Sequence, residues 1–168
     1  IVCPAFPENH RTVFKGHLFV GDVLLSDSGM RNHPLTPMTD ANLVRVMQAQ
    51  TQRRVALVGH DVVALGSDAV AQRFAALRQE GFGVAVVDTV NRDNLMTIGR
   101  ALDGMALVTA GSGIAVGLPQ NWQLKGTLQP NAHTDALPAA RGWQAVVSGS
   151  CSQATQAQVQ HFKSLGLP

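Results

Sequence analysis

Two glycine- and serine-rich turns carry the residues that could bind an anion. The first is Gly111-Ser112-Gly113, which opens a predicted helix. Glycines let a ligand approach the backbone closely, and the free N–H groups at a helix start attract phosphate or carboxylate. The spacing departs from the dinucleotide-binding fingerprint, because the third glycine, Gly117, comes one position late and no acidic residue follows at the expected distance. A tight strand-to-helix turn without a ligand is the simpler interpretation.

The second turn is Ser148-Gly149-Ser150-Cys151-Ser152, which precedes another predicted helix. Its three hydroxyls could hold a phosphate or a carboxylate. A hydrolase elbow would need G-x-S-x-G, and the second glycine is missing here. Cys151 is either a reactive thiol at a helix start or, more commonly for cysteine, a small buried apolar residue. We therefore assign no catalytic nucleophile.

The histidines and acidic residues do not predict a metal site. The six histidines lack metal-ligand spacing, and the two cysteines do not form a C-x-x-C pair. His17 and Asp22 lie five positions apart around a predicted hairpin. They are either contacts to a ligand or ordinary loop residues.

The composition excludes several classes of protein. Hydrophobic residues make up 45% of the 168 residues, charged residues 14%, and the formal net charge is +2. High apolar content with little net charge excludes a disordered chain. No apolar run approaches the roughly 18 residues of a membrane span, and the scattered lysines and arginines do not form a nucleic-acid-binding stripe. Two cysteines and the lack of a signal peptide predict a reduced, cytoplasmic protein.

Short apolar runs alternate with helical periodicities over most of the chain. Buried strands are expected at residues 55–58, 84–87, 105–108 and 143–147. Helices are expected at residues 67–80, 91–102, 111–118 and 152–165, and a further helix capped by Asp40 is expected to contain Leu43, Val44, Val46 and Met47. In the last helix, Ala154, Ala157 and Phe162 are expected to face partly inward. Residues 119–142 are predicted to be a loop or linker.

The first forty residues predict a different kind of structure. Residues 12–14 and 18–20 flank Lys15-Gly16-His17 and are expected to pair as a hairpin. The long stretch 21–38 carries enough apolar side chains to be packed. Together with the alternating elements, this predicts an α/β fold: a Rossmann-like three-layer domain with a mainly parallel sheet and a small β-hairpin region near the N-terminus.

Ligands of such sheets bind outside the carboxyl ends of the strands. Every predicted strand is followed by glycine or polar residues, at 59–61, 88–89, 109–113 and 148–152. The residues alone therefore predict an anion-binding edge and no particular reaction.

Several segments resemble the four-carbon acid sugar kinases. They run in order along nearly the whole chain: CPAFPENHRTV at residues 3–13, GHLFVGDVLLSDSGM at 16–30, HPLTPM at 33–38, a T-G-G-S-G-L-A-like run at 109–118 with Ala110 replacing a glycine, and SGSCS at 148–152. Within that family the sequence is most similar to the 3-oxo-tetronate kinase branch.

The resemblance implies a fold of two α/β domains and an activity. Such enzymes use ATP and Mg²⁺ to phosphorylate the terminal hydroxyl of a four-carbon sugar acid, 3-oxo-tetronate or a related tetronate, in sugar-acid catabolism. The family's D-D-x-T-G turn and its glycine-rich ATP-binding domain are missing, and the catalytic base is expected outside this chain. The chain is then a fragment of the acid-sugar domain that is inactive alone. Residues 1–40 would form the hairpin and long loop of this domain, and residues 41–142 its parallel βα repeats. Residues 143–168 would form a strand and a helix that connect to the nucleotide-binding domain.

The resemblance also suggests roles for individual residues. His17, Gly21 and Asp22 are assigned to the sugar acid. Six residues are assigned to the nucleotide or its phosphate: Ser148, Ser150, Ser152, Gly111, Ser112 and Gly113, of which the last three could serve either substrate. The expected partners are small molecules and a possible second copy of the chain, without nucleic acid or membrane.

Two other functions remain open. One is a non-catalytic module that binds a small anion or a nucleotide. The other is an NAD-dependent oxidoreductase based on Gly111-Ser112-Gly113, against which the late Gly117 and the missing acidic residue already count.

Overall fold

The computed structural model describes residues 1–129, 131, 134–143, 145–150 and 152–166. The chain divides into two compact units, Ile1–Pro130 and Asn131–Pro168. The first unit contains both sheets, and the second contains one helix.

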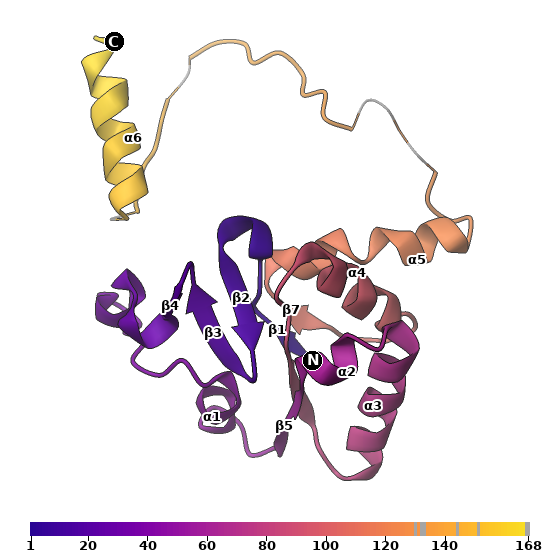
Figure 1. The fold of residues 1–168 in the computed structure, drawn as a ribbon. Helices are drawn as coiled ribbons and strands as arrows, with labels where there is room; N and C mark the ends of the chain where they lie inside the picture. The colour runs from indigo at the N-terminus through magenta and orange to yellow at the C-terminus, as the bar shows by residue number, and fades with distance from the viewer. Residues whose placement is uncertain (130, 132–133, 144, 151, 167–168) are drawn as a thin grey trace. The chain divides into compact units, whose positions relative to one another are not determined.

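A parallel sheet forms the centre of the first unit (Figure 1). Its four strands lie in the order β5-β6-β1-β7. They span β1 Val2–Cys3, β5 Val55–Val58, β6 Val84–Val87 and β7 Thr109–Ala110. Every neighbouring pair is parallel, with Val2 opposite both Val86 and Thr109. The predicted α/β class with a mainly parallel sheet is thereby confirmed.

The predicted hairpin is present and has a third strand. Strands β2 (Arg11–Phe14), β3 (His17–Val20) and β4 (Val23–Leu24) form an antiparallel sheet in that order. Val13 lies opposite Leu18, and both side chains are buried. The stretch after β3 is packed as expected around the buried Leu25, in two short 3-10 helices at Leu25–Asp27 and Gly29–Asn32, although Leu35 is exposed.

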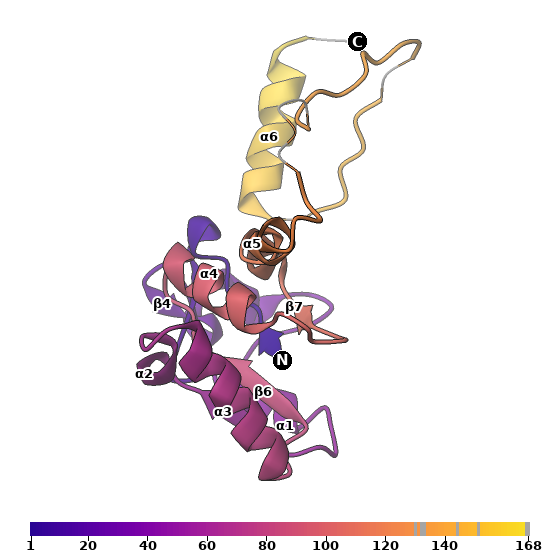
Figure 2. The ribbon, with the colours of Figure 1, turned by 90° about the vertical axis from the view of Figure 1, so that its right-hand side faces the viewer.

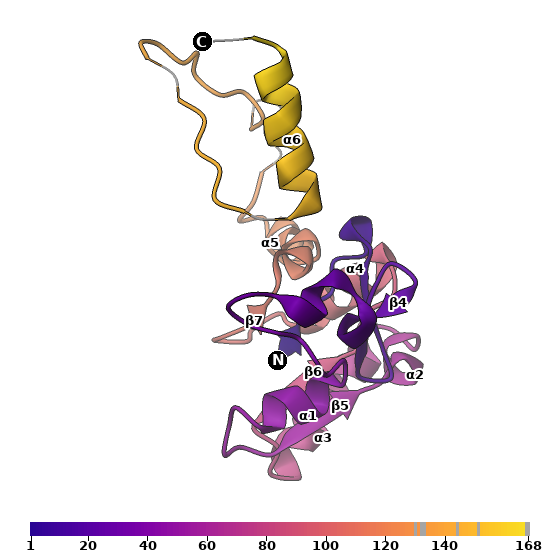
Figure 3. The ribbon, with the colours of Figure 1, turned by 90° about the vertical axis from the view of Figure 1, so that its left-hand side faces the viewer.

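Helices cover the parallel sheet on both faces. Figure 2 shows α3 (Ser67–Gln79) and α4 (Arg92–Ala101) in front of the sheet, and Figure 3, from the opposite side, shows α1 (Leu43–Gln48) in front. The short helix α2 (His60–Val63) follows β5 directly and contacts α3. This is the predicted three-layer arrangement.

The apolar stripes of the helices explain this packing. Helix α3 buries Val70, Phe74 and Leu77, whose spacing places them on one face of the helix. Helix α4 begins after Asn91, whose side chain accepts the backbone N–H of Asn94 at 2.9 Å.

The predicted cap of α1 was wrong by two residues. Asn42 caps the helix, because its Oδ1 accepts the N–H of Arg45 at 3.0 Å. Asp40 instead accepts the N–H of Asn42 at 2.9 Å and pairs with the Arg45 guanidinium.

The predicted strand at residues 105–108 was also wrong. The chain forms a strand only at β7, where Val2 and Cys3 of β1 supply partners to Thr109 and Ala110. Leu107 is 80% exposed, so this leucine belongs neither to a buried strand nor to the hydrophobic core. The short helix expected next is a 3-10 helix, Ser112–Val116.

The stretch predicted as loop or linker contains a helix. Helix α5 spans Pro119–Leu124 and begins with a proline, which is well tolerated in the first turn. Its Asn121 is buried and donates from Nδ2 to the carbonyl of Gly99 at 2.7 Å, which ties α5 to α4.

The second unit contains α6 (Gln153–Ser164), close to the predicted helix, with Ser152 as its N-cap. Ala154, Ala157 and Phe162 are exposed, so their expected inward orientation was wrong. The strand expected at 143–147 was wrong for the described residues 143 and 145–147, which are neither strand nor helix. Val146 and Val147 are 74% and 94% exposed. An apolar run becomes a strand only where a neighbour satisfies its backbone groups.

Candidate functional site

The carboxyl ends of the parallel strands meet the turn of the β2–β3 hairpin. Lys15 and Gly16 form this turn, with φ angles of 48° and 73°. In that left-handed conformation both backbone N–H groups point toward Asp88, the residue that follows β6. The hairpin therefore occupies the sheet edge at which the sequence predicted a ligand.

Asp88 is fully buried and accepts three backbone N–H groups. One oxygen accepts from Gly16 at 2.8 Å, and the other accepts from Lys15 at 2.7 Å and from His60 at 3.0 Å. Hydrogen bonds to a carboxylate are stronger than those between neutral groups. The Asp88 carboxylate thus joins the hairpin, strand β6 and the start of helix α2.

The next residue, Thr89, extends the same junction. Its backbone exchanges two hydrogen bonds with Val13 of β2, both at 2.8 Å. Its hydroxyl lies 3.3 Å from the thiol of Cys3. Burial raises the pKa of the Cys3 thiol, outweighing the hydrogen bonds that lower it. Cys3 is therefore a packed thiol and not a thiolate nucleophile.

The Gly111-Ser112-Gly113 turn packs against the segment after β1. The N–H of Gly111 donates to the carbonyl of Cys3 at 2.9 Å. A Cβ at Gly113 would lie 2.3 Å from the carbonyl oxygen of Ala5. The close approach that requires glycine here is therefore to the chain itself. Only Ser112 of the three is exposed.

The three residues predicted to bind the sugar acid do not lie together. His17 stands at the start of β3, next to the Lys15–Gly16 turn, whereas Gly21 and Asp22 follow the other end of the strand. β3 spans about 10 Å at roughly 3.4 Å per residue. His17 is half-buried and lies 2.8 Å from the Lys15 carbonyl oxygen through Nδ1, and 3.4 Å from the Asn42 amide nitrogen through Nε2.

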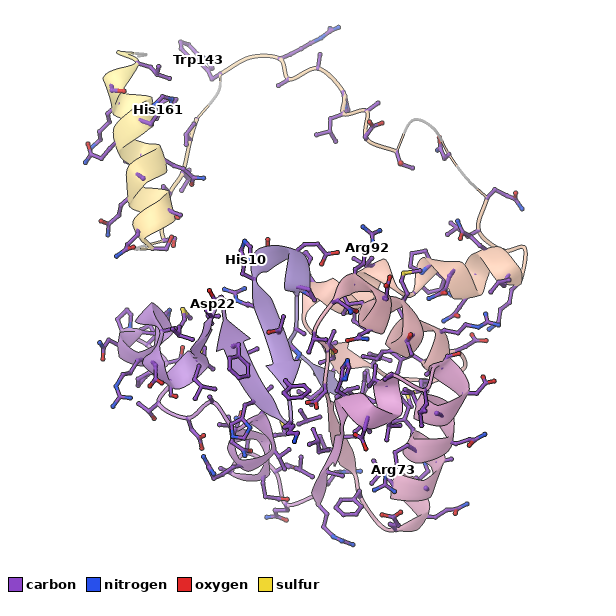
Figure 4. All side chains as sticks on the ribbon, viewed as in Figure 1. His10, Asp22, Arg73, Arg92, Trp143 and His161 are labelled. Atoms are coloured by element: carbon purple, nitrogen blue, oxygen red, sulfur yellow. The ribbon has the colours of Figure 1, made fainter. Side chains whose placement is uncertain are left out.

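Gly21 and Asp22 share the outer end of the hairpin with His10. The N–H of Gly21 donates to the carbonyl of His10 at 2.7 Å, and Figure 4 shows the His10 and Asp22 side chains at this end. Arg92 begins α4 and lies 4.0 Å from Glu8 in an exposed ion pair. This end carries cationic and acidic groups that can bind a carboxylate and hydroxyls respectively.

Sequence reasoning did not single out His10 or Arg92. Their positions depend on two contacts, the Gly21–His10 hydrogen bond and the Glu8–Arg92 pair. Each contact joins residues more than ten positions apart. The local sequence indicates only a turn before His10, through Pro7 and Asn9. These two residues begin and end the short 3-10 helix Pro7–Asn9, after which the chain turns at His10.

The serines predicted to bind phosphate belong to the second unit. Ser148 and Ser150 are exposed and outside any helix or strand. The N–H of Ser152 donates to the hydroxyl of Ser150 at 3.2 Å, and the Ser152 hydroxyl accepts from the N–H of Thr155 at 3.2 Å. The Ser152 side chain thus caps α6. Cys151 lies outside the described residues.

A dedicated metal site is not built within the described ranges, since no three His, Cys, Asp or Glu side chains gather there. Among the helices that the structure describes, none combines the length and apolarity needed to cross a membrane.

Residues 1–118 match a family described as the sugar-binding N-terminal domain. The chain belongs to this family. The chain is 51% identical over 168 residues to a protein of Cupriavidus necator named 3-oxo-tetronate kinase, covering all of this chain and 39% of that protein. It thus spans about two fifths of the length of the curated relatives it matches. The resemblance to the sugar-acid kinases is confirmed.

Solved structures share the fold of this chain. Haemophilus influenzae protein HI1011, described by the family model DUF1537, superposes with a TM-score of 0.73 at 43% identity over 97% of this chain and 38% of that one. A DUF1537 protein of Bordetella bronchiseptica, a domain-swapped dimer with bound citrate, superposes with a TM-score of 0.59 at 29% identity over 77% of this chain and 31% of that one.

Proposed function

We propose that the chain is the sugar-acid-binding part of an ATP-dependent kinase that phosphorylates the terminal hydroxyl of 3-oxo-tetronate or a related four-carbon acid. The observation that carries this proposal is 51% identity along the entire chain to a protein named 3-oxo-tetronate kinase. The bound citrate of the Bordetella bronchiseptica relative, itself a small hydroxy acid, supports a ligand of this class for the chain.

The sugar acid would bind around the antiparallel sheet. In this proposal Asp22 accepts a hydrogen bond from a hydroxyl, and Gly21 leaves space for the ligand at the outer end of the hairpin. His17, near the Lys15–Gly16 turn at the other end of β3, is also assigned to the sugar acid. The exposure of Gly21 and Asp22 supports their accessibility to a ligand.

The nucleotide would be bound by other residues. We assign Ser148, Ser150 and Ser152 to the nucleotide or the transferred phosphate, because they precede a twelve-residue helix whose first N–H groups attract anions. Of the Gly111-Ser112-Gly113 turn, which was assigned to either substrate, only the exposed Ser112 is proposed to contact a ligand. In this proposal residues 143–168 lead toward a nucleotide-binding domain, after the hairpin region 1–40 and the repeats 41–142.

ATP and Mg²⁺ are implied by the kinase names of the relatives. The Gly113 position does not fit a nucleotide cradle, because Ala5 already occupies the space beside it. Mg²⁺ commonly binds one or two carboxylates together with substrate phosphates. The described residues gather no group of three His, Cys, Asp or Glu side chains, so Mg²⁺ would depend on one or two carboxylates together with the substrate phosphates.

The proposal extends to assembly and location. A homodimer is supported by the domain-swapped dimer of the Bordetella bronchiseptica relative. A cytoplasmic location is supported by the buried, unpaired thiol of Cys3, which suits a reducing compartment.

The test has two arms. In the first, the chain alone is titrated with erythronate and threonate by calorimetry, and then assayed with ATP; we expect binding without phosphorylation. In the second, a longer polypeptide that includes this sequence is assayed with ATP and a panel of tetronates, and we expect phosphorylation. Turnover by the chain alone would contradict its proposed role as a part of the enzyme.

One alternative is favoured by the bound citrate of the Bordetella bronchiseptica relative: a module that binds small anions without catalysis. It predicts thermal stabilisation of the longer polypeptide by citrate and tetronates alike, with no ATP consumption.

A further inference from the structure

Strand β7 forms an edge of the parallel sheet, and its outer side is open. It ends the order β5-β6-β1-β7, and both of its residues, Thr109 and Ala110, are exposed (Figures 2 and 3). The opposite edge strand, β5, is covered: its four residues are buried or half-buried, and the Gln48 side chain of α1 accepts the N–H of Val55 at 3.0 Å. Native proteins generally protect the edges of their sheets in some such way. The open edge of β7 therefore needs an explanation.

The backbone of Ala110 points toward this open edge. Ala110 lies opposite Cys3 of β1, and the carbonyl of Cys3 accepts the N–H of Gly111, the next residue, at 2.9 Å. In a parallel ladder, the residue opposite such an acceptor directs its own N–H and C=O to the other side of the strand. Ala110 thus presents one donor and one acceptor at the open edge, and the described part of the chain supplies neither with a backbone partner.

Apolar side chains adjoin the open edge. Leu107, two residues before β7, is 80% exposed, and it lines a surface groove together with Phe74, Ala101 and Met105. Transfer of such apolar surface out of water is favourable. A segment that docks at this edge would therefore gain backbone hydrogen bonds from Ala110 and apolar burial at Leu107.

We propose that β7 is an inner strand of a larger sheet, in which a fifth, parallel strand pairs with Ala110 and covers Leu107. This strand comes from the part of the longer polypeptide that lies outside residues 1–168. The chain covers 39% of the Cupriavidus necator relative, so a polypeptide of that length has ample residues for the strand and its connection. The inference uses the proposed function only in that the chain is part of a longer polypeptide.

The parallel order of the sheet favours this occupant over a second copy of the chain. Every neighbouring pair of strands in the sheet is parallel. Parallel strands are joined by crossover connections within one polypeptide, and both faces of such sheets are normally covered by those connections. A segment of the same polypeptide can therefore supply both the strand and the cover for Leu107.

The added strand would also complete the ligand-binding edge beside β7. Parallel strands end at the same edge of a sheet, and ligands bind just beyond it. The turn that follows the added strand would lie next to the Gly111-Ser112-Gly113 turn, in which only Ser112 is exposed. Ser112 would then share its ligand with residues from outside this chain.

Hydrogen exchange tests the backbone pairing. Exchange of single amides is measured by mass spectrometry with electron-transfer fragmentation, in the chain alone and in a longer polypeptide that includes it. We expect the Ala110 amide to exchange freely in the chain alone and to be protected at least about 100-fold in the longer polypeptide. The Gly111 amide, which is bonded to Cys3, is the internal control and should be protected in both.

Photo-crosslinking identifies the segment that covers the edge. The photoreactive amino acid p-benzoylphenylalanine replaces Leu107 in the longer polypeptide, and the cross-linked peptides are sequenced by mass spectrometry. We expect intramolecular cross-links to residues outside this sequence. The same replacement at Leu65 is the matched control, because Leu65 is 77% exposed in the connection between α2 and α3 and should give few such cross-links.

Each outcome either supports or overturns the inference. An unprotected Ala110 amide in the longer polypeptide, with Gly111 protected, overturns it. Protection of Ala110 in the chain alone also overturns it: residues 131–168 cover the edge if the protection is independent of concentration, and a second copy does so if it is not. Cross-links from position 107 to either of these overturn it even if the chain alone does not fold. Neither readout uses a sugar acid or ATP, so this inference and the proposed kinase activity fail separately.

Discussion

At the scale of single residues, the acidic side chains of this molecule differ in what balances their charge. Asp88 is buried and is satisfied by backbone N–H groups alone. Asp40 lies near the surface and forms a two-pronged pair with Arg45, at 2.5 and 2.6 Å. The hydrogen bonds of Asp88 join distant segments, whereas the Asp40–Arg45 pair links two residues five positions apart at the start of α1.

The Asp40 pair gives a prediction about titration. The hydrogen bond from Arg45 is the main cause that lowers the pKa of Asp40 to about 2 from the model-peptide value of 3.8. Because the folded-state pKa is lowered, the stabilisation is complete above the unfolded value and is lost as pH falls from about 4 to about 2. We expect NMR titration to place the Asp40 midpoint near 2, and Arg45→Gln to return it toward 3.8. An unchanged midpoint in Arg45→Gln would contradict the assigned cause.

At the scale of elements, the correctly predicted helices and strands are those whose apolar pattern matches the structure that they form. Helix α3 and strands β5 and β6 carry their apolar pattern locally, and the hairpin has a turn of its own. The errors concern segments whose structure depends on distant partners. Residues 105–108 gave a strong apolar run, but the strand forms at Thr109–Ala110, where β1 supplies hydrogen bonds.

The candidate site was predictable only in part for the same reason. The sequence placed Asp88 and Gly111–Gly113 at the carboxyl edge of the sheet, and they lie there. The sequence could not indicate that the turn formed by Lys15 and Gly16, which lie 73 and 72 positions before Asp88, also lies at the carboxyl edge of the sheet. Nor could spacing show that the length of β3 separates His17 from Asp22.

The packing of the 3-10 helix Ser112–Val116 against the segment after β1 predicts a sensitive glycine. In Gly113→Ala the new methyl group would meet the Ala5 carbonyl, so the backbone must shift. Overpacking of this kind costs about 1–3 kcal/mol. Urea unfolding should report that loss, while Gly29→Ala, a position with open space and no positive φ, should stay within roughly 0.5 kcal/mol of wild type. Equal stability of the two variants would argue against the close approach.

At the scale of the whole molecule, the core is confined to one unit. All the buried apolar residues of the core cluster lie between Cys3 and Ile114. The described residues 134–143 and 145–150, by contrast, are exposed and contain neither helix nor strand. The buried core and the serines proposed to bind phosphate thus lie in different stretches of the chain.

This division predicts the course of limited proteolysis. Arg141 is exposed in a stretch without helix or strand, and such sites are cut first. Brief trypsin treatment should release a fragment that ends at Arg141 and unfolds cooperatively, and Arg141→Gln should slow that first cut. A first cut at Arg78 or Arg100, within α3 and α4, would mean that the core is less stable than its burial implies.

The central place of β1 has a consequence for how the chain is made. Val2 lies between Val86 and Thr109, so β1 precedes both of its neighbouring strands in the chain by a long interval. At about 5–20 residues per second, Thr109 follows Val2 by roughly 5–20 s. Until Val86 has been synthesised the nascent β1 segment has neither of these two partner strands, and a chaperone that shields it would raise the yield of folded protein.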